Sequence, residues 1–504
     1  MLNVASVTYI CLLFLPVKGT IIYVSVCKYF LTEVAKMSHS NDSTAAKRIR
    51  EVLDKDSFVE LGAYVTARST DFNLADRDTP ADGVVTGYGT IEDKLVFIYS
   101  QDPAVLGGSV GEMHAKKIAN LYDQALKMGA PVIGLIDCSG LRLQEASDAL
   151  NAVGELYRCQ AVANGVVPQI QAVFGACGGS MAVSAAIADF TFIETEKGKL
   201  FIHSPNAVAG STEQDLDTAS AAFQTEKSGN ADFAGTEKEI YEGIRTLVSI
   251  LPANNEDDLS YTECTDSLNR LVPEIEGADA AALLKAVSDD GFVCEPNSAY
   301  GLPVVTAFIR LNGCTVGAVA NADPEASWKG LAKAAKFVNF CDAFCIPVVT
   351  FVNAAGMKKT ECTELYGAKA SAALACAYAN ATVPKVTVIT GEAYGTMYSV
   401  FGSKAVGADV VYAWPQAKIA LMEAGNAVKV MYAEELETAE NRGEFYQEKV
   451  AAYTELQGSA LGAAKRGYVD DIIEPQVTRK RIIAALEMLF TKREDRPVKK
   501  HGTV

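Results

Sequence analysis

The sequence predicts an α/β protein made of two copies of one fold, and three observations lead to this prediction. The segments APVIGLIDCSG and IPVVTFVNAAG both resemble buried strands ending in glycine, and their prolines, Pro131 and Pro347, lie 216 residues apart. VVPQIQAVFGACGG and TVPKVTVITGEAYG repeat a strand and glycine pattern at the same separation. Helix-like and strand-like segments alternate within each half, which is typical of an α/β architecture. We therefore expect an internal duplication rather than a short-period solenoid.

The elements of each half follow the order strand, helix, strand, glycine loop, helix and strand. In the first half, GVVTGYGTIEDKLVFIYSQDP is followed by the helical AKKIANLYDQALKMG, the strand PVIGLIDCS, the helical LQEASDALNAVGELYRCQAVANG, the strand PQIQAVFG, the helical GGSMAVSAAIA and FTFIETEKGKLFI. In the second half the corresponding elements, in the same order, are PVVTAFIRLNGCTVGAVANADP, KGLAKAAKFVNFCDAF, PVVTFVN, TELYGAKASAALACAYANA, PKVTVIT, YGTMYSVFGSKAVG and DVVYAWPQAKIALME. Ligands of such folds bind at the carboxyl ends of the strands.

The ends of the chain and the middle segment differ in composition from these halves. Residues 1–36 form an apolar extension, and Met37 opens a polar stretch leading into a helix. We interpret Met37 as the natural start, with a membrane anchor as the alternative. The polar segment near 249–266 is the expected linker. The predicted domains are therefore 37–255 and 267–490, followed by a polar tail, 491–504.

Charge and composition exclude several classes of function. The formal net charge of −17 disfavours nucleic-acid binding, which needs clustered Lys and Arg. Twelve cysteines and four histidines show no zinc-ligand spacing, so we expect no metal site and reduced thiols in a cytoplasm.

The two glycine loops are the strongest candidates for a site. Neither has the GxxxxGK[ST] pattern of a phosphate loop nor a dinucleotide fingerprint. Each ends a strand and begins a helix, so backbone amides near Gly178, Gly179 and Ser180, and near Gly395, Thr396 and Met397, could hold an oxyanion. The alternative is that glycine permits close packing of the helix on its sheet.

Longer stretches carry a family resemblance. SQDPAVLGGSVGEMHAKKI, DCSGLRLQEASDAL, FGACGGSMAVSAAIADFTF and ATVPKVTVITGEAYGTMYSVFGSKAVGADVVYAWPQAKIALM resemble the carboxyltransferase subunits of biotin-dependent acyl-CoA carboxylases and decarboxylases. The resemblance covers about 45–490. It implies two tandem crotonase-like (ClpP/crotonase) domains, the first holding acyl-CoA and the second biotin, with each active site completed across a dimer interface.

The resemblance also implies roles for particular residues and partners. The first loop would donate amides to the thioester oxygen of a propionyl-CoA or methylmalonyl-CoA, and the second to the ureido oxygen of biotin. Gly107, Gly108, Ser109, Gly140, Arg142 and Gln144 would line the CoA site, although Arg142 and Gln144 could equally form a salt bridge or helix start. The chain has no biotinylated lysine, which implies a separate biotin carboxyl carrier protein. The resemblance further implies that the chain works with a biotin carboxylase or a membrane decarboxylase subunit. It implies a location in the cytoplasm or, through such a partner, at the membrane periphery. It also implies a homo-oligomer, such as a hexamer built as a trimer of dimers.

Two departures from the family keep alternatives open. Thr396 and Met397 stand where relatives commonly have a small glycine pair, and NAAGMKKTECTELYG replaces a segment usually rich in Gly and Pro. The alternatives are a CoA-thioester hydratase or isomerase on the same fold, and a catalytically degenerate structural subunit.

Overall fold

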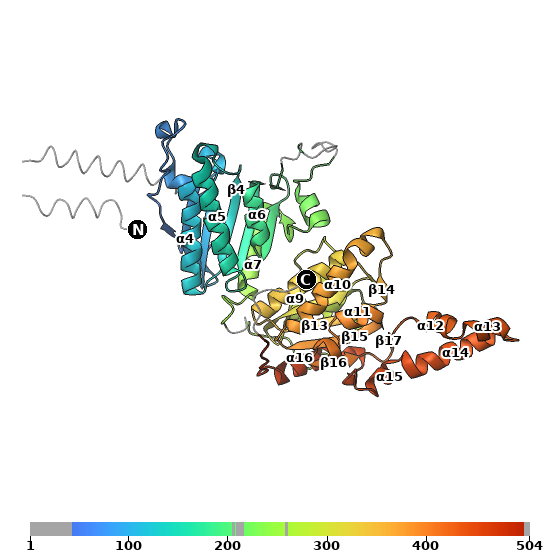
Figure 1. The fold of residues 1–504 in the computed structure, drawn as a ribbon. Coiled ribbons are helices and arrows are strands. Elements are labelled where there is room, and N and C mark those ends of the chain that lie inside the picture. The colour runs from blue at the N-terminus through green and yellow to red at the C-terminus, as the bar shows by residue number, and fades with distance from the viewer. Residues whose placement is uncertain (1–42, 204–206, 208–215, 258–260, 498–504) are drawn as a thin grey trace, which may run out of the picture.

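The computed structural model describes residues 43–203, 207, 216–257 and 261–497. The apolar extension 1–36, Met37 and residues 498–504 of the predicted tail lie outside the described residues. The described chain forms two α/β halves that pack against each other, with a helical arm extending from the second half (Figure 1). This confirms the predicted α/β class.

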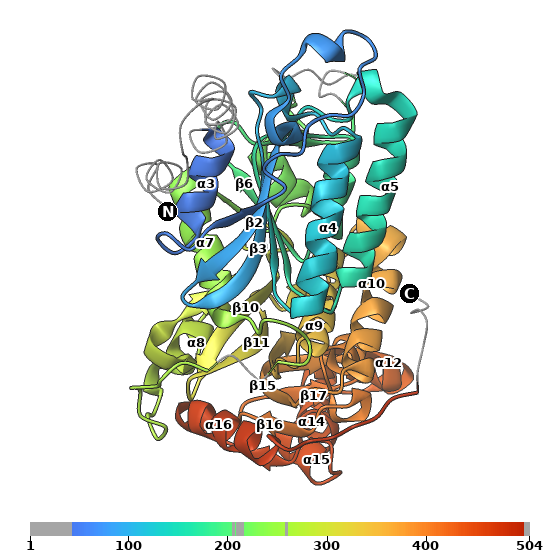
Figure 2. The same cartoon turned by 90° about the vertical axis from the view of Figure 1, so that its left-hand side faces the viewer.

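The first half consists of one mixed sheet with helices on both faces. Its helices are α3 (Thr44–Val52), α4 (Glu112–Met128), α5 (Ala146–Ala163), α6 (Ser180–Ile187) and α7 (Glu237–Ile250). Its strands are β1 (Val59–Leu61), β2 (Val84–Ile91), β3 (Lys94–Gln101), β4 (Val132–Cys138), β5 (Gln169–Gly178), β6 (Phe190–Glu194), β7 (Lys199–Phe201) and β8 (Phe233–Gly235). Helices α4 and α5 cover one face and α3 and α7 the other (Figure 2).

The second half has a sheet of the same strand order. Its strands are β9 (Val293–Cys294), β10 (Val304–Leu311), β11 (Cys314–Asn321), β13 (Val348–Ala354), β15 (Lys385–Tyr394), β16 (Val410–Ala413), β17 (Lys418–Ala420) and β18 (Asp471–Ile472). The first sheet runs β1-β2-β3-β4-β5-β6-β8 with β7 beside β5, and the second runs β9-β10-β11-β13-β15-β16-β18 with β17 beside β15. A small pair, β12 (Glu325–Ala326) and β14 (Gly356–Met357), completes the strands of this half.

The register of the central strands also agrees between the halves. Val132 pairs with Gln169 in the first sheet, and Val348 pairs with Lys385 in the second. In both pairs the register shifts just before the glycine loop, between Ile136 and Cys138 and between Val352 and Ala354. This irregularity turns the ends of the two strands at the place where each glycine loop begins.

The helices of the second half begin with side-chain caps at several positions. They are α8 (Ala280–Val287), α9 (Trp328–Ala343), α10 (Glu361–Asn380), α11 (Gly395–Val400), α12 (Ala424–Met431), α13 (Ala433–Thr438), α14 (Arg442–Gln457), α15 (Ala460–Ala464) and α16 (Thr478–Met488). Ser327, for example, accepts a hydrogen bond from the amide of Gly330, and Thr360 accepts one from Thr363. These caps satisfy amides that have no partner inside the helix.

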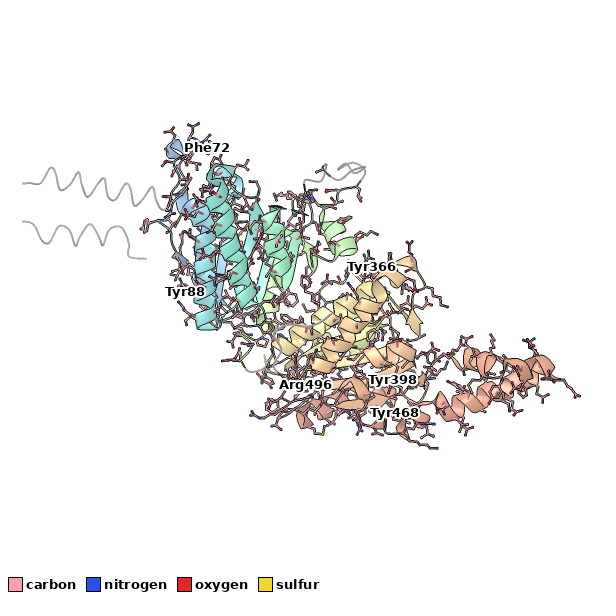
Figure 3. The ribbon with its side chains drawn as sticks, in the orientation of Figure 1. Phe72, Tyr88, Tyr366, Tyr398, Tyr468 and Arg496 are labelled. Carbon is pink, nitrogen blue, oxygen red and sulfur yellow. The ribbon has the colours of Figure 1, made fainter. Side chains whose placement is uncertain are left out.

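Helices α12, α13 and α14 form the arm that extends from the second half. Helix α14 buries none of its residues, and the side chains of the arm stand out from it on the visible sides (Figure 3). Val430 and Met431 on α12 are largely exposed, with 72% and 58% of their surface accessible. Ala427 and Val428 on α12 and Leu436 on α13 are buried, so the arm buries only a few apolar side chains.

The hydrophobic core is continuous across the junction of the halves. One cluster of buried residues includes Phe190 on β6 of the first half together with Phe308 and Phe340 of the second. The ring centroids of Phe190 and Phe340 lie 4.9 Å apart, and those of Phe190 and Phe308 lie 6.0 Å apart. These edge contacts add to the burial of apolar area, so the two halves pack as one body.

Candidate active site

The first glycine loop lies between the end of β5 and the start of α6. Gly179 is the N-cap of α6 and has φ 56° and ψ −114°, a conformation that only glycine adopts readily. A Cβ added at Gly178 would lie 2.7 Å from the ring of Phe201, whereas a Cβ added at Gly179 would meet nothing within 4 Å. Position 178 is therefore glycine because the Phe201 ring packs against it. Position 179 is glycine for a different reason: its φ is positive, and the space where a side chain would lie is open.

The amides of this loop are not equally available. The Gly179 amide donates to the carbonyl of Phe201 on β7 at 2.9 Å, so it is already occupied. The Gly179 carbonyl accepts from the amide of Ala182 at 3.1 Å, which starts the helix. The amides of Ser180 and Met181 belong to the first turn of α6, where no intrahelical carbonyl can accept from them. These two amides, rather than that of Gly179, are the donors the loop can offer, and Met181 was not among the residues predicted from the sequence.

The second glycine loop occupies the same place between β15 and α11. Gly395 has φ 51°, and a Cβ added there would lie 3.1 Å from the carbonyl oxygen of Leu421. Thr396 is exposed, whereas Met397 is only 2% exposed and packs in the main core. Met397 is thus buried in the core and Thr396 is exposed to solvent, and the amides in the first turn of α11 have no carbonyl of their own helix to bind.

The predicted CoA-lining residues form a pair of interlocked turns in the first half. The Ser139 amide donates to the Gly107 carbonyl at 3.1 Å, and the Val110 amide donates to the Gly140 carbonyl at 2.9 Å. A Cβ added at Gly108 would lie 2.1 Å from the carbonyl oxygen of Asp137, so only glycine fits there. The structure therefore brings residues 107–109 together with the segment 139–142.

These turns also lie beside the first glycine loop. Cys138 at the end of β4 pairs with Cys177 at the end of β5, which places the two strand ends side by side. Gln144 is partly exposed at the start of the turn that precedes α5. Four predicted segments, around residues 108, 140, 144 and 179, thus meet at the carboxyl edge of one sheet.

Arg142 is placed differently from the expectation that it lines a substrate. Its side chain is fully buried, and Nη1 donates to Asp82 Oδ1 at 2.6 Å and to Glu145 Oε1 at 2.7 Å. Nη2 donates to the carbonyl of Ser109 at 3.0 Å. A buried guanidinium bonded to two carboxylates has no surface to offer a ligand, so the alternative of a salt bridge describes it better. Its role here is to hold the turn at Ser109 against the segment that follows β4.

His114 extends this buried network and has no catalytic geometry. Its Nδ1 donates to the Asp82 carbonyl at 2.9 Å, and its Nε2 accepts from Gln101 Nε2 at 3.1 Å. The orientation of Gln101 is fixed in turn, because its Oε1 accepts from the amide of Asp137 at 3.2 Å. Burial and the nearby Arg142 charge lower the pKa of His114 to about 3, so the ring is neutral.

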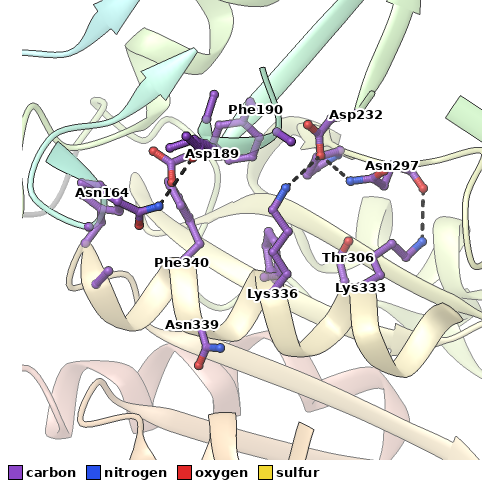
Figure 4. A pocket seen from close by; sticks show the side chains of 18 residues that line it. Asn164, Asp189, Phe190, Asp232, Asn297, Thr306, Lys333, Lys336, Asn339 and Phe340 are labelled. Atoms are coloured by element: carbon purple, nitrogen blue, oxygen red, sulfur yellow. Dashed lines mark hydrogen bonds and ion pairs between the residues drawn. The ribbon is translucent and has the colours of Figure 1, made fainter. Parts of the chain in front are cut away.

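A cavity of about 390 Å³ lies at the junction of the halves, and none of the predicted site residues lines it (Figure 4). Asp189 and Asp232 line it from the first half, and Asn297, Lys333 and Lys336 line it from the second. Asp189 accepts a hydrogen bond from the amide of Gln169 at 2.8 Å. Its counterpart Asp409 accepts one from the amide of Lys385 at the same distance, so this carboxylate serves the start of a strand in both halves. We therefore assign the polar residues that line the cavity a structural role in joining the two halves.

The described ranges contain neither a metal-binding cluster nor a membrane-spanning helix. No group of three or more His, Cys, Asp or Glu side chains there could hold a metal ion. No helix within those ranges combines the length and the apolar character needed to cross a bilayer.

Comparisons with known proteins agree on one family. The carboxyl transferase domain matches residues 37–504. The methylmalonyl-CoA decarboxylase subunit alpha of Propionigenium modestum is 38% identical to this chain over 94% of it and 95% of that relative. The propionyl-CoA carboxylase carboxyltransferase subunit of Haloferax mediterranei is 39% identical over the same shares. A hexameric transcarboxylase 12S structure with methylmalonyl-coenzyme A and methylmalonic acid bound superposes with a TM-score of 0.89 at 34% identity, over 97% of this chain and 99% of that one.

Proposed function

This chain belongs to the carboxyl transferase family, and on that premise we propose that it moves a carboxyl group between an acyl-CoA and biotin attached to a separate carrier protein. The acyl-CoA is propionyl-CoA, methylmalonyl-CoA or a near relative, since these are the substrates in the names of its relatives. The observation that carries the proposal is the glycine loop that occurs at the same place in two sheets of the same strand order.

In the proposed mechanism the first loop acts on the thioester. When the α-carbon of the acyl group gains carbanion character, negative charge collects on the thioester oxygen. Amides of Ser180 and Met181 at the start of α6 would donate to that oxygen, helped by the positive end of the helix dipole. Gly179 leaves space for the thioester to approach, because no side chain occupies the position of its missing Cβ.

The second loop would act on the biotin of the carrier in the same way. The amides of Gly395, Thr396 and Met397 lie in the first turn of α11, where no carbonyl of that helix can accept from them. Donors of this kind suit the ureido oxygen of biotin. Bound biotin supplies the nitrogen that carries the carboxyl group and can exchange a proton with the acyl α-carbon. The chain therefore needs no acid or base of its own, which agrees with the buried, neutral His114.

Residues of the interlocked turns complete the proposed acyl-CoA side. Gly107, Gly108, Ser109, Gly140 and Gln144 would line the path of the CoA, and Arg142 would position them. We further propose that the halves are two crotonase-like domains, 37–255 and 267–490, which arose by duplication of one fold. The matching strand order and the matching register shifts support this.

The proposed setting is a homo-oligomer working with other subunits in the cytoplasm. A hexamer is supported by the transcarboxylase 12S relative, whose structure is described as a hexamer assembly. The partners would be a biotin carboxyl carrier protein and either a biotin carboxylase or a membrane decarboxylase subunit. The ten cysteines that the structure describes are free thiols, which suits a reducing compartment.

A hydratase or isomerase is less well supported. Such an enzyme needs carboxylates facing the first loop. Asp137, near the end of β4, pairs with Arg48 at 3.0 Å, and Glu145, in the segment after β4, pairs with Arg142 at 2.7 Å, so both carboxylates are engaged.

One assay separates the proposed function from its alternatives. The purified chain is incubated with methylmalonyl-CoA, with and without free biotin or biotinylated carrier, and the loss of the carboxyl group is measured. A parallel incubation with an enoyl-CoA measures hydration. Biotin-dependent decarboxylation supports the carboxyltransferase. CoA binding without turnover supports a structural subunit, and biotin-independent hydration of an enoyl-CoA supports the hydratase.

A further inference from the structure

Helix α6 is held in place by hydrogen bonds that side chains of α5 donate. The Tyr157 hydroxyl donates to the carbonyl of Ser180 at 2.6 Å. Gln160 Nε2 donates to the carbonyl of Ser184 at 3.3 Å, one turn further along α6. Tyr157 and Gln160 are three residues apart on α5 and so lie on one face of it. These two hydrogen bonds hold α6 at two points along its length and so fix its position relative to the carboxyl edge of the sheet.

The contact of Tyr157 falls on a peptide group of the first glycine loop. The Ser180 carbonyl and the Met181 amide belong to one peptide group, and the described residues, Ser180 and Met181 among them, have no cis peptide bonds. In a trans peptide the C=O and N–H bonds point in opposite directions. Tyr157 therefore binds one end of this group while the Met181 amide points away from it, toward the start of α6.

The neighbouring peptide groups of the loop are fixed by backbone partners alone. The group that ends in the Gly179 amide is held by the Phe201 carbonyl at 2.9 Å. The group that starts with the Gly179 carbonyl is held by the Ala182 amide at 3.1 Å. The group between Ser180 and Met181 differs, because a side chain outside the loop binds its carbonyl.

We propose that Tyr157 is a positioning residue for the acyl-CoA reaction, which orients and polarises the Ser180–Met181 peptide group so that its amide binds the thioester oxygen more strongly. This inference rests on the proposed function of the first loop. A carbonyl that accepts a hydrogen bond makes the amide of the same peptide group a better donor, because hydrogen bonds in a chain polarise one another. The benefit grows with the charge on the oxygen, so it is larger in the transition state than in the bound substrate.

In the described part of the second half, the corresponding side chains of α10 make no equivalent hydrogen bond to α11. The positions 216 residues after Tyr157 and Gln160 are Ala373 and Cys376 on α10. Alanine has no donor, and neither side chain donates to a carbonyl of α11 within the described part of the chain. Tyr157 thus reinforces only the loop on the proposed acyl-CoA side. Burial raises the pKa of Tyr157, so the hydroxyl keeps its proton and remains a donor.

The test compares Tyr157→Phe with the wild type and with Tyr241→Phe. Tyr241 is a matched control, because it is also half-buried in the first half and its hydroxyl donates to Glu237 Oε2 at 3.2 Å, outside the loop. The kcat and KM for methylmalonyl-CoA are measured in the presence of biotinylated carrier. We expect kcat to fall about two- to tenfold in Tyr157→Phe with KM within about twofold of the wild type, and no change in Tyr241→Phe.

A spectroscopic readout separates positioning from a general loss of structure. Carbon-13-labelled acetyl-CoA, which has no carboxyl group to lose, is bound to each protein, and its thioester carbonyl stretch is recorded by difference infrared spectroscopy. The wild type should lower the frequency relative to free acetyl-CoA, and Tyr157→Phe should lower it less. An unchanged frequency and kcat in Tyr157→Phe, or equal losses in Tyr241→Phe, would overturn the inference. Absence of both wild-type turnover and wild-type frequency shift would instead reject the proposed function.

Discussion

Replacing Gly179 by alanine should abolish acyl-CoA chemistry while leaving the fold intact. The added methyl group would meet no atom of the chain within 4 Å, so it would project into the space assigned to the thioester. Displacing a reacting group or losing one oxyanion donor costs about a hundredfold in rate or more. We therefore expect kcat/KM for methylmalonyl-CoA to fall at least about a hundredfold.

The stability cost of this change is small by comparison. Gly179 has φ 56° and ψ −114°, and holding an alanine in such a conformation costs roughly 1–3 kcal/mol. Native proteins are stable by about 5–15 kcal/mol, so the variant remains folded at assay temperature. Gly277→Ala is the matched control, because Gly277 has φ 76° and its added Cβ also meets nothing within 4 Å, but it lies outside the site.

The assay is biotin-dependent decarboxylation of methylmalonyl-CoA by the wild type, Gly179→Ala, Gly277→Ala and Gly395→Ala. Gly395→Ala should chiefly raise KM for the biotinylated carrier, because its Cβ lies 3.1 Å from the carbonyl of Leu421 and displaces the second loop. Equal losses in Gly179→Ala and Gly277→Ala would show that backbone strain, not occupation of the site, explains the effect. Identical effects of Gly179→Ala and Gly395→Ala on both substrates would refute the division of labour between the loops.

Three further predictions concern stability. Because the pKa of His114 is lowered from 6.5 to about 3, only the unfolded chain binds a proton at this residue as pH falls below 6.5, so the contribution of His114 to stability should drop by about 2 kcal/mol by pH 5. Pulse proteolysis in urea at pH 7.5 and 5.0 should show this drop to be smaller in His114→Gln. Arg142→Met should cost about 3–5 kcal/mol in urea unfolding, because it leaves Asp82 and Glu145 buried without their cation, and Asp82→Asn with Glu145→Gln should restore part of it. Phe340→Ala should cost about 3–5 kcal/mol and raise hydrogen exchange in β6 and β10 together, whereas an increase in β10 alone would contradict a shared core.

The matching strand order of the two halves and their main elements could be predicted from the sequence because they depend on local patterns. Strands β4 and β13 and strands β5 and β15 begin at positions 216 residues apart, as the matched prolines and glycines indicated. Gly179 and Gly395 both have positive φ, which agrees with glycine loops placed between a strand and a helix. The arm formed by α12, α13 and α14 had no counterpart in the first half, so the repeat could not reveal it.

The interactions within the site could not be predicted, because they join residues distant in sequence. Arg142 is buried through Asp82, 60 residues away, and nothing near Arg142 in the sequence indicates that partner. The Gly179 amide is occupied by the carbonyl of Phe201, which depends on the pairing of β7 with β5. The hydroxyl of Tyr157 reaches Ser180 only because α5 and α6 pack side by side. A glycine pattern thus locates a loop but does not show which of its amides are free.

The aromatic junction between the halves has a consequence for the timing of catalysis. Because Phe190, Phe308 and Phe340 pack in one continuous core, the two halves carry their glycine loops on one packed body. In the proposed function biotin must come to the second loop, so its delivery depends on the reach of the carrier that bears it. The length and stiffness of the carrier's tether would then set the local concentration of biotin at that loop. Shortening that tether should slow complete turnover while leaving reactions with free biotin unchanged.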